Sequence, residues 1–234
     1  MEWVVALALG ILPGLVWLVF FLREDDHPEP KTMILKVFVA GGVSAIVAVL
    51  LQALTETFFK QTLVLTLPQL VEENVVPYLA FSLIEEGIKF LLVFLVVRKS
   101  VDFDEPVDAM VYMITGALGF ATVENLFLAY SSGGDDLFSL MLLRFVGATL
   151  LHALGSGIIG HYWARGIKFN LEAKFIVAGV VMATLFHAVF NILVLRFNNL
   201  LVYPISFLVL IGFFVLYDFE ELKKLDELKP KVYT

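Results

Sequence analysis

Seven mostly apolar stretches, each long enough to cross a lipid bilayer as a helix, take up most of this 234-residue chain. A helix needs about 20 such residues to span the hydrocarbon core. The stretches are residues 3–22, 33–54, 75–97, 107–130, 137–164, 175–196 and 200–217. Since 60% of the residues are hydrophobic, too few polar side chains remain to cover a globular surface in water. The sequence therefore predicts an all-α bundle of about seven transmembrane helices, in a multi-pass protein of the cell membrane.

The spans leave no room for a second folded domain, so residues 1–234 are predicted to form one integral membrane domain. The net charge is −7, but the acidic residues gather in the loops and the tail, so no nucleic-acid partner is expected. Because the chain has no cysteine, disulfides and thiolate ligands are excluded, and any metal must be held by histidine and carboxylate. The oligomeric state does not follow from the sequence.

Lysine and arginine alternate between rich and poor connections along the chain. The first, third and fifth connections and the tail are rich in them, whereas the second, fourth and sixth are poor. The basic residues of the rich segments include Arg23, Lys31, Arg98, Lys99, Arg165, Lys168, Lys174, Lys223, Lys224, Lys229 and Lys231. By the positive-inside rule, the amino terminus lies outside and the short tail, residues 218–234, lies in the cytoplasm. An odd number of spans fits that arrangement.

Four of the spans carry acids or histidines at a depth where lipid disfavours them, namely Glu85, Glu86, Glu124, His152 and His187. Each costs at least about 2–3 kcal/mol on insertion scales, so such residues usually mark function. They are also the residue types that bind a metal and activate water. The alternative interpretation is that they only make polar packing contacts between helices.

The first acidic pair has a basic neighbour on its own helix. Glu85 and Lys89 are four residues apart, so they share a helix face and are predicted to pair. Adjacent helical residues diverge by about 100°, so Glu86 is predicted to point elsewhere. Two acids with one base leave an excess negative charge, which favours a site that needs a proton acceptor or a cation.

Residue counting places the polar groups at similar depths. Glu85, Glu124 and His187 lie roughly 15, 9 and 14 Å from the outer ends of their spans at 1.5 Å per residue. His152 lies fifteen residues into the long span 137–164. All four are therefore expected to meet in the outer half of the membrane. Near the other end of that span, His161 and its aromatic neighbours are typical of an interfacial belt.

The ordered set of these motifs resembles the PrsW family of intramembrane metalloproteases, which is related to the CAAX-type prenyl proteases. The resemblance covers about residues 75–195, and it implies a catalytic core over about 75–196. The matching motifs are Glu85-Glu86-x-x-Lys89, Phe120-x-x-x-Glu124, Arg144 with His152 eight residues later, and His187-x-x-x-Asn191.

The resemblance implies an endopeptidase that attacks a peptide carbonyl with activated water. Three ligands with one open position are the usual catalytic zinc arrangement, so zinc is the expected cofactor. Glu85 would be the general base, and Asn191 would steady the oxyanion. The roles implied are catalytic for Glu85, Glu86 and Asn191, metal-ligating for Glu124, His152 and His187, and supporting for Lys89, Arg144 and Phe120. Water activated by glutamate alone, without metal, stays open.

The resemblance also implies the substrate, a single-span membrane protein such as an anti-sigma factor, cut near its extracytoplasmic side within the lipid bilayer. The alternative from another class is a proton- or cation-coupled transporter, because intramembrane acids and histidines also build relays. Against it, the sequence shows no inverted repeat and no pair of Gly- or Pro-interrupted spans.

Overall fold

The computed structural model describes residues 2–63, 75–131, 137–197 and 200–227, and this part of the chain is helical without strands. The predicted fold class is therefore confirmed. The helices are α1 (Glu2–Phe21), α2 (Lys31–Leu63), α4 (Val76–Val97), α5 (Asp108–Ser131), α6 (Leu137–Val146), α7 (Ala148–Lys168), α8 (Glu172–Arg196) and α9 (Val202–Glu227).

The bundle has the lengths and apolarity of a multi-pass membrane protein. Six helical stretches of the described chain are long and apolar enough to cross a bilayer, and they correspond to α1, α2, α5, α6 with α7, α8 and α9. Helix α4 is not among these six stretches. It has 22 residues and carries Glu85, Glu86 and Lys89 near its middle. Glu86 and Lys89 are buried inside the protein, so lipid does not meet these charges.

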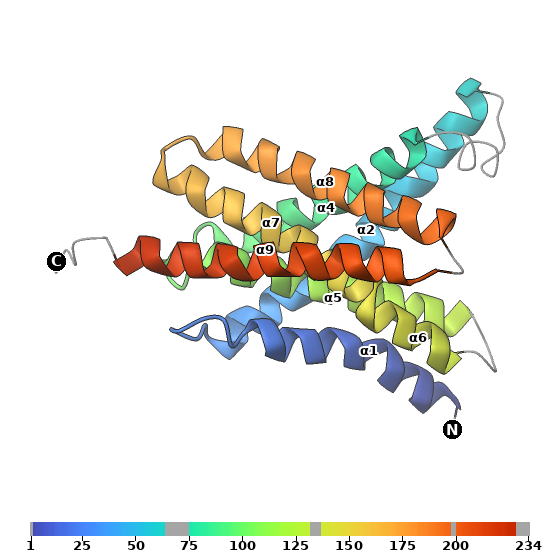
Figure 1. Cartoon of the computed structure of the whole chain (residues 1–234), viewed down its shortest axis with the longest axis horizontal. Helices are drawn as coiled ribbons and strands as arrows, with labels where there is room; N and C mark the ends of the chain where they lie inside the picture. The colour runs from blue at the N-terminus through green and yellow to red at the C-terminus, as the bar shows by residue number, and fades with distance from the viewer. Residues whose placement is uncertain (1, 64–74, 132–136, 198–199, 228–234) are drawn as a thin grey trace.

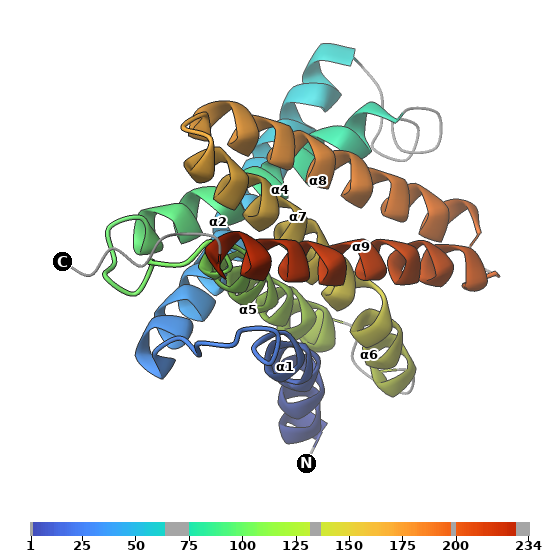
Figure 2. The same cartoon turned by 60° about the vertical axis from the view of Figure 1, so that its left-hand side comes forward.

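Successive helices run in alternating directions between the two ends of the bundle, except that α7 continues in the direction of α6 (Figure 1). The amino-terminal end of α1 and the carboxyl-terminal end of α9 lie at opposite ends of the molecule. The turned view in Figure 2 shows α9 crossing the front of the bundle, and α9 packs on α7 and α8. The basic connections all lie at the end where α9 finishes. Which end faces the cytoplasm stays a prediction from the positive-inside rule.

Helix α5 lies at the centre of the bundle. Its residues 108–122 are all buried, and it packs against α1, α2 and α7. Glycines allow the backbones of α2 and α5 to touch: a Cβ on Gly41 would clash with the backbone of Gly116, and one on Gly119 with the carbonyl of Phe38. Large apolar side chains on the outer helices point outward instead, as a lipid-facing surface requires.

The predicted span over 137–164 is present as a span but is not one helix, because the helix breaks at Gly147 into α6 and α7. A Cβ at this position would lie 2.7 Å from the carbonyl oxygen of Leu143, so any other residue would force the backbone to shift. Non-helical backbone at membrane depth is tolerated where it lines a cavity, and Gly147 does so.

Two helices run further than the predicted spans. Helix α2 continues to Leu63 instead of stopping at 54, and α9 continues to Glu227 instead of stopping at 217. The connection predicted over 55–74 is therefore partly helix, and its remainder, 64–74, lies outside the described residues.

Candidate active site

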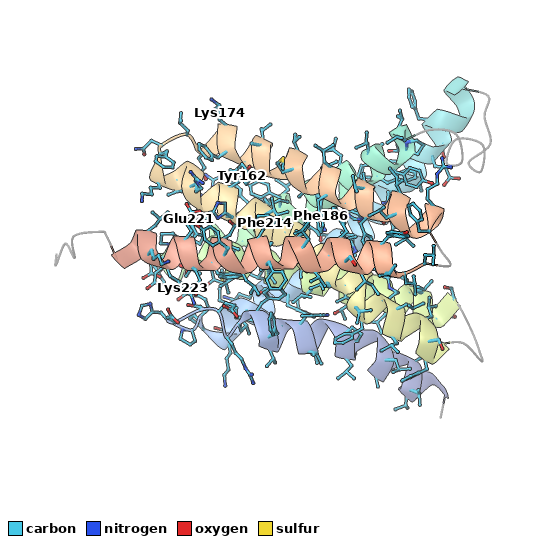
Figure 3. All side chains as sticks on the ribbon, viewed as in Figure 1. Tyr162, Lys174, Phe186, Phe214, Glu221 and Lys223 are labelled. Carbon is cyan, nitrogen blue, oxygen red and sulfur yellow. The ribbon has the colours of Figure 1, made fainter. Side chains whose placement is uncertain are left out.

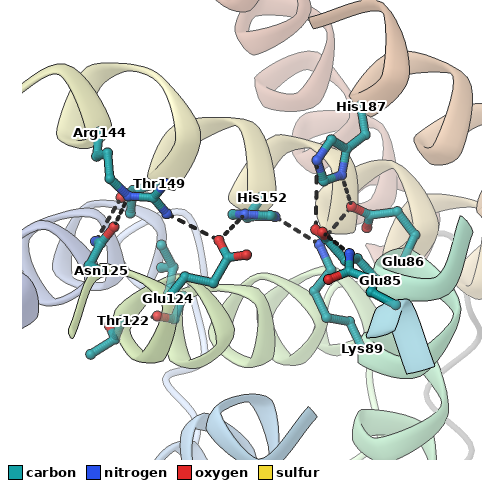
Figure 4. Close-up of polar contacts among 12 residues, drawn as sticks. Glu85, Glu86, Lys89, Thr122, Glu124, Asn125, Arg144, Thr149, His152 and His187 are labelled. Atoms are coloured by element: carbon teal, nitrogen blue, oxygen red, sulfur yellow. Dashed lines mark hydrogen bonds and ion pairs between the residues drawn. The ribbon is translucent and has the colours of Figure 1, made fainter. Parts of the chain in front are cut away.

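Four helices bring the predicted polar residues into one buried cluster (Figure 4). The members are Glu85, Glu86 and Lys89 from α4, Glu124 from α5, His152 from α7 and His187 from α8. Because α7 begins only at Ala148, the break at Gly147 places His152 in the second turn of a new helix. Residues separated by up to 101 positions are thus in hydrogen-bonding contact.

Glu86, not Glu85, is the partner of Lys89. Lys89 Nζ donates to Glu86 Oε1 over 2.6 Å, and both side chains are buried. The predicted Glu85–Lys89 pair is therefore replaced by a pair three residues apart, a spacing that also brings helical side chains together. His187 Nδ1 lies 2.8 Å from the same Glu86 oxygen, so Glu86 links α4 to α8. Glu86 is thus a structural centre of the cluster.

Glu85 has a different environment from Glu86. Its Oε1 accepts a hydrogen bond of 2.7 Å from Gln52 Nε2 on α2. Its Oε2 is buried, has no hydrogen-bond partner within the described chain, and lies 3.7 Å from His187 Nε2. Sequence reasoning missed Gln52, although an amide near the end of an otherwise apolar span was a signal for it.

Glu124 and His152 form the other half of the cluster. His152 Nε2 lies 2.9 Å from Glu124 Oε2, and Arg144 Nη2 donates to the same oxygen over 3.1 Å. Arg144 Nε also donates to the side-chain oxygen of Asn125, and Asn125 Nδ2 donates to Thr149 Oγ1 over 3.2 Å. Arg144 therefore holds Glu124 in place, and Asn125 is a further buried polar residue that sequence reasoning did not assign a role.

An aromatic ring supports the two central side chains. The ring of Phe120 lies 5.0 Å from the ring of His152, and Lys89 Nζ lies over the same Phe120 ring at 5.0 Å. Lys89 Nζ is also 3.1 Å from His152 Nδ1. Phe120 thus fixes both the imidazole and the ammonium by packing.

Glu85, His152 and His187 are placed where they would hold a metal ion. Each offers a ligand atom, and these atoms lie within 4.8 Å of one another. One nitrogen of each imidazole faces an acid, Glu124 for His152 and Glu86 for His187. Carboxylates commonly orient metal-binding histidines in this way. The other nitrogen of His187 faces Glu85 at 3.7 Å, whereas that of His152 lies 3.1 Å from Lys89 Nζ, which would have to move for a metal to bind there.

The charges of the cluster also fit a cation. Its three carboxylates face two permanent cations, Lys89 and Arg144, so one negative charge is in excess. Of the three ligands predicted from the sequence, His152 and His187 belong to the group of close ligand atoms, and Glu85 is its third member. Glu124 contacts Arg144 and His152, and its role as a ligand stays a prediction.

A cavity of about 740 Å³ reaches the cluster from the end of the bundle that holds the start of α9. Glu85, Arg144 and Asn191 lie on its wall, together with Gln52 and the backbone break at Gly147. The rest of the wall is mostly apolar. Asn191 lies one turn beyond His187 on α8, so the sequence motif places both on one face.

A multi-pass helical bundle with acids, imidazoles and a cavity at membrane depth defines the class of membrane-embedded hydrolases. The family model described as "PrsW family intramembrane metalloprotease" matches residues 29–217. The chain belongs to this family. It is accordingly a protease, and the transporter interpretation is set aside.

Curated relatives agree with the family match over most of the chain. "Protease PrsW" of Bacillus subtilis (strain 168) is 27% identical over 218 residues, covering 89% of this chain and 91% of the relative. "Protease PrsW" of Oceanobacillus iheyensis is 25% identical over 212 residues, covering 90% and 93%. "Protease PrsW" of Geobacillus kaustophilus is 27% identical over 198 residues, covering 81% and 79%. No solved structure matches the chain.

Proposed function

We propose that this protein is an intramembrane metalloendopeptidase that cleaves a single-span membrane protein near its extracytoplasmic end. The observation that carries the proposal is the position of Glu85, on the wall of the 740 Å³ cavity and beside both imidazoles. The Oε2 atoms of both Glu85 and Glu86 have no hydrogen-bond partner within the described chain, but of the two acids Glu85 is the one that lines the cavity. Glu85 is thus the acid of the pair that meets a water molecule or a peptide entering from the cavity.

The residues around Glu85 divide into those that meet substrate and those that hold the site together. Gln52 fixes one Glu85 oxygen and leaves the other for the proton of the attacking water. Asn191, on the same cavity wall, would donate to the oxygen of the peptide carbonyl as negative charge develops there. Glu86 and Glu124 orient His187 and His152.

A metal fits the donor set of Glu85, His152 and His187, and zinc is the ion we propose. When bound, it supplies a Lewis acid that polarises the attacking water and the peptide carbonyl. If Glu85 serves as a base and not as a ligand, Glu124 remains the third ligand predicted from the sequence. The catalytic core then comprises residues 75–196 with Gln52 added from α2.

The position of the cavity supports the proposed side of cleavage. The cavity lies toward the end of the bundle that carries few basic residues, which the positive-inside rule places outside. A membrane-anchored substrate such as an anti-sigma factor would therefore be cut near the outer end of its transmembrane helix. The apolar cavity wall suits a peptide segment that leaves the lipid.

The proposal is tested with the purified protein in lipid vesicles and a single-span substrate that carries a different tag on each side. Wild-type protein should release the outer tag, and Glu85→Gln should release at least about 100-fold less, as expected for loss of a general base. Glu220→Gln, on an exposed face of α9, is the matched control and should cleave normally. Normal cleavage by Glu85→Gln, or release of the inner tag, would overturn the proposal.

A further inference from the structure

A second cluster of metal-ligand residues lies near the opposite end of the bundle from the cavity. It consists of His161 on α7 with Asp218 and Glu221 on α9, and their ligand atoms lie within 4.8 Å of one another. Figure 3 labels Glu221 near the carboxyl-terminal end of α9 and Tyr162, the sequence neighbour of His161, on α7. We propose that these three side chains bind a divalent transition-metal ion that fastens α9 to α7.

The burial of His161 is the first observation behind the proposal. The depth of this histidine at the membrane interface stays a prediction, but its side chain is only 7% exposed and so is buried within the protein. Its Nδ1 is buried and has no hydrogen-bond partner within the described chain. Leaving a buried polar atom unsatisfied costs about 1–3 kcal/mol, so such an atom calls for a partner. The two acids around it, Asp218 and Glu221, point to a cation.

The spacing of the three side chains suits a shared ion better than direct contacts. His161 Nδ1 lies 3.6 Å from Asp218 Oδ1, too long for a hydrogen bond, and one ligand atom from each of the three side chains lies within 4.8 Å of the others. An ion would use one imidazole nitrogen, and the 4.0 Å contact of Glu221 Oε2 is with the other, Nε2, so Glu221 would have to turn toward the ion. Two ligands bound at about 2.0–2.1 Å to one tetrahedral ion are about 3.4 Å apart. Small side-chain rotations would therefore close the site around an ion.

The charge of the cluster leaves room for a cation. Asp218 and Glu221 provide two carboxylates, and the nearby cation is Arg165, whose Nη1 lies 3.6 Å from Glu221 Oε1. With a neutral imidazole the group carries one negative charge in excess, and Arg165 would hold Glu221 in position as a ligand. One imidazole with two carboxylates favours zinc or another transition metal over magnesium, which prefers oxygen ligands.

At this position an ion would stabilise the packing of α9 on α7. Helix α9 packs mainly on α7 and α8. Its first residues, including Pro204 and Ile205, line the cavity. An ion that joins the far end of α9 to α7 would fix a helix that forms part of the cavity wall. This site is separate from the cluster of Glu85, His152 and His187, and it does not depend on the proposed reaction.

The test compares zinc binding by the purified full-length wild type with two substitutions on α9. Asp218→Asn removes a ligand without changing size, and Glu220→Gln removes a neighbouring exposed acid that contacts Lys223. Wild type and Glu220→Gln should bind one more equivalent of Zn²⁺ than Asp218→Asn. Loss of a group that only orients a ligand costs about 10–100-fold in affinity, so loss of a ligand should cost about 100-fold or more.

Thermal unfolding gives an independent readout, because an ion that binds only the folded protein raises its Tm. Zn²⁺ should raise the Tm of wild type and Glu220→Gln more than that of Asp218→Asn, and Mg²⁺ should raise none of them. Glu221→Gln, at a half-exposed position, takes the place of Asp218→Asn if the latter does not fold. Equal zinc stoichiometry and equal Tm shifts in wild type and the ligand variant would overturn the proposal and leave an ion-pair network.

Discussion

His187 Nδ1 and Glu86 Oε1 lie 2.8 Å apart and join α8 to α4 across 101 residues of sequence. This contact directs the other nitrogen of His187, Nε2, toward Glu85 Oε2 at 3.7 Å. Glu86 also accepts from Lys89 over 2.6 Å, so one buried carboxylate positions both a histidine and an ammonium. The two adjacent glutamates therefore have different tasks: Glu86 holds the cluster together and Glu85 faces the cavity.

The metal content of Glu85→Gln will show whether Glu85 is a ligand or a base. If Glu85 is a ligand, the variant should lose both cleavage and the zinc of this site. If it is only the base, cleavage should fall by about 10²–10⁴-fold while the zinc remains. The zinc content of purified wild type and Glu85→Gln is measured per mole of protein, beside their cleavage rates. Glu220→Gln serves as the control for both assays.

Replacing Glu86 should affect stability more than replacing Glu85. Glu86→Gln leaves the buried Lys89 ammonium without its carboxylate, and breaking a buried ion pair costs about 3–5 kcal/mol. The double variant Glu86→Gln with Lys89→Met removes both charges and should regain part of the loss. Thermal inactivation rates are compared among wild type, Glu85→Gln, Glu86→Gln and the double variant. A Glu86→Gln protein as stable as wild type would show that the pair does not hold the cluster.

Removal of metal should stop cleavage. A strong chelator is expected to inhibit wild type, and added zinc should restore activity. His152→Ala and His187→Ala should each lower bound zinc, because both imidazoles belong to the group of close ligand atoms. Full activity in protein that contains no metal would remove the zinc mechanism and leave water activated by glutamate.

The break between α6 and α7 should depend on Gly147. Alanine there would bring Cβ to 2.7 Å from the Leu143 carbonyl oxygen, so backbone must shift beside Arg144 and the start of α7. We expect Gly147→Ala to lower the Tm and to reduce cleavage by about tenfold or more, since small displacements of a catalytic group are costly. Gly212→Ala, whose Cβ would meet Leu154 only at 4.0 Å, is the control and should do neither.

The orientation of the bundle is open to a labelling test because the chain has no cysteine. Leu200 and Lys168 are exposed at opposite ends of the bundle. A membrane-impermeant thiol reagent added to intact cells should label Leu200→Cys, and it should label Lys168→Cys only after the membrane is opened. The reverse pattern would place the amino terminus in the cytoplasm and move the expected cleavage site to the other side.

The sequence by itself determined the fold class and the members of the polar cluster. Spans of about 20 apolar residues predict membrane helices from length alone, and a charge such as Glu85 or Glu124 inside them needs a partner within the protein. These signals are local, so they can be read without knowing how the helices pack. The ordered motifs then indicated the family that the comparisons confirm.

Only the tertiary structure decided which groups pair and where the helices break. Positions three and four residues along a helix are both neighbours of Lys89, so spacing did not distinguish Glu86 from Glu85. Contacts from other helices distinguish the two glutamates, because Gln52 binds Glu85 and His187 binds Glu86. The break at Gly147 likewise does not appear in the hydropathy, because residues 137–168 form one apolar stretch. Hydropathy reports the cost of meeting lipid, whereas pairing is set by distances between helices that only the folded bundle defines.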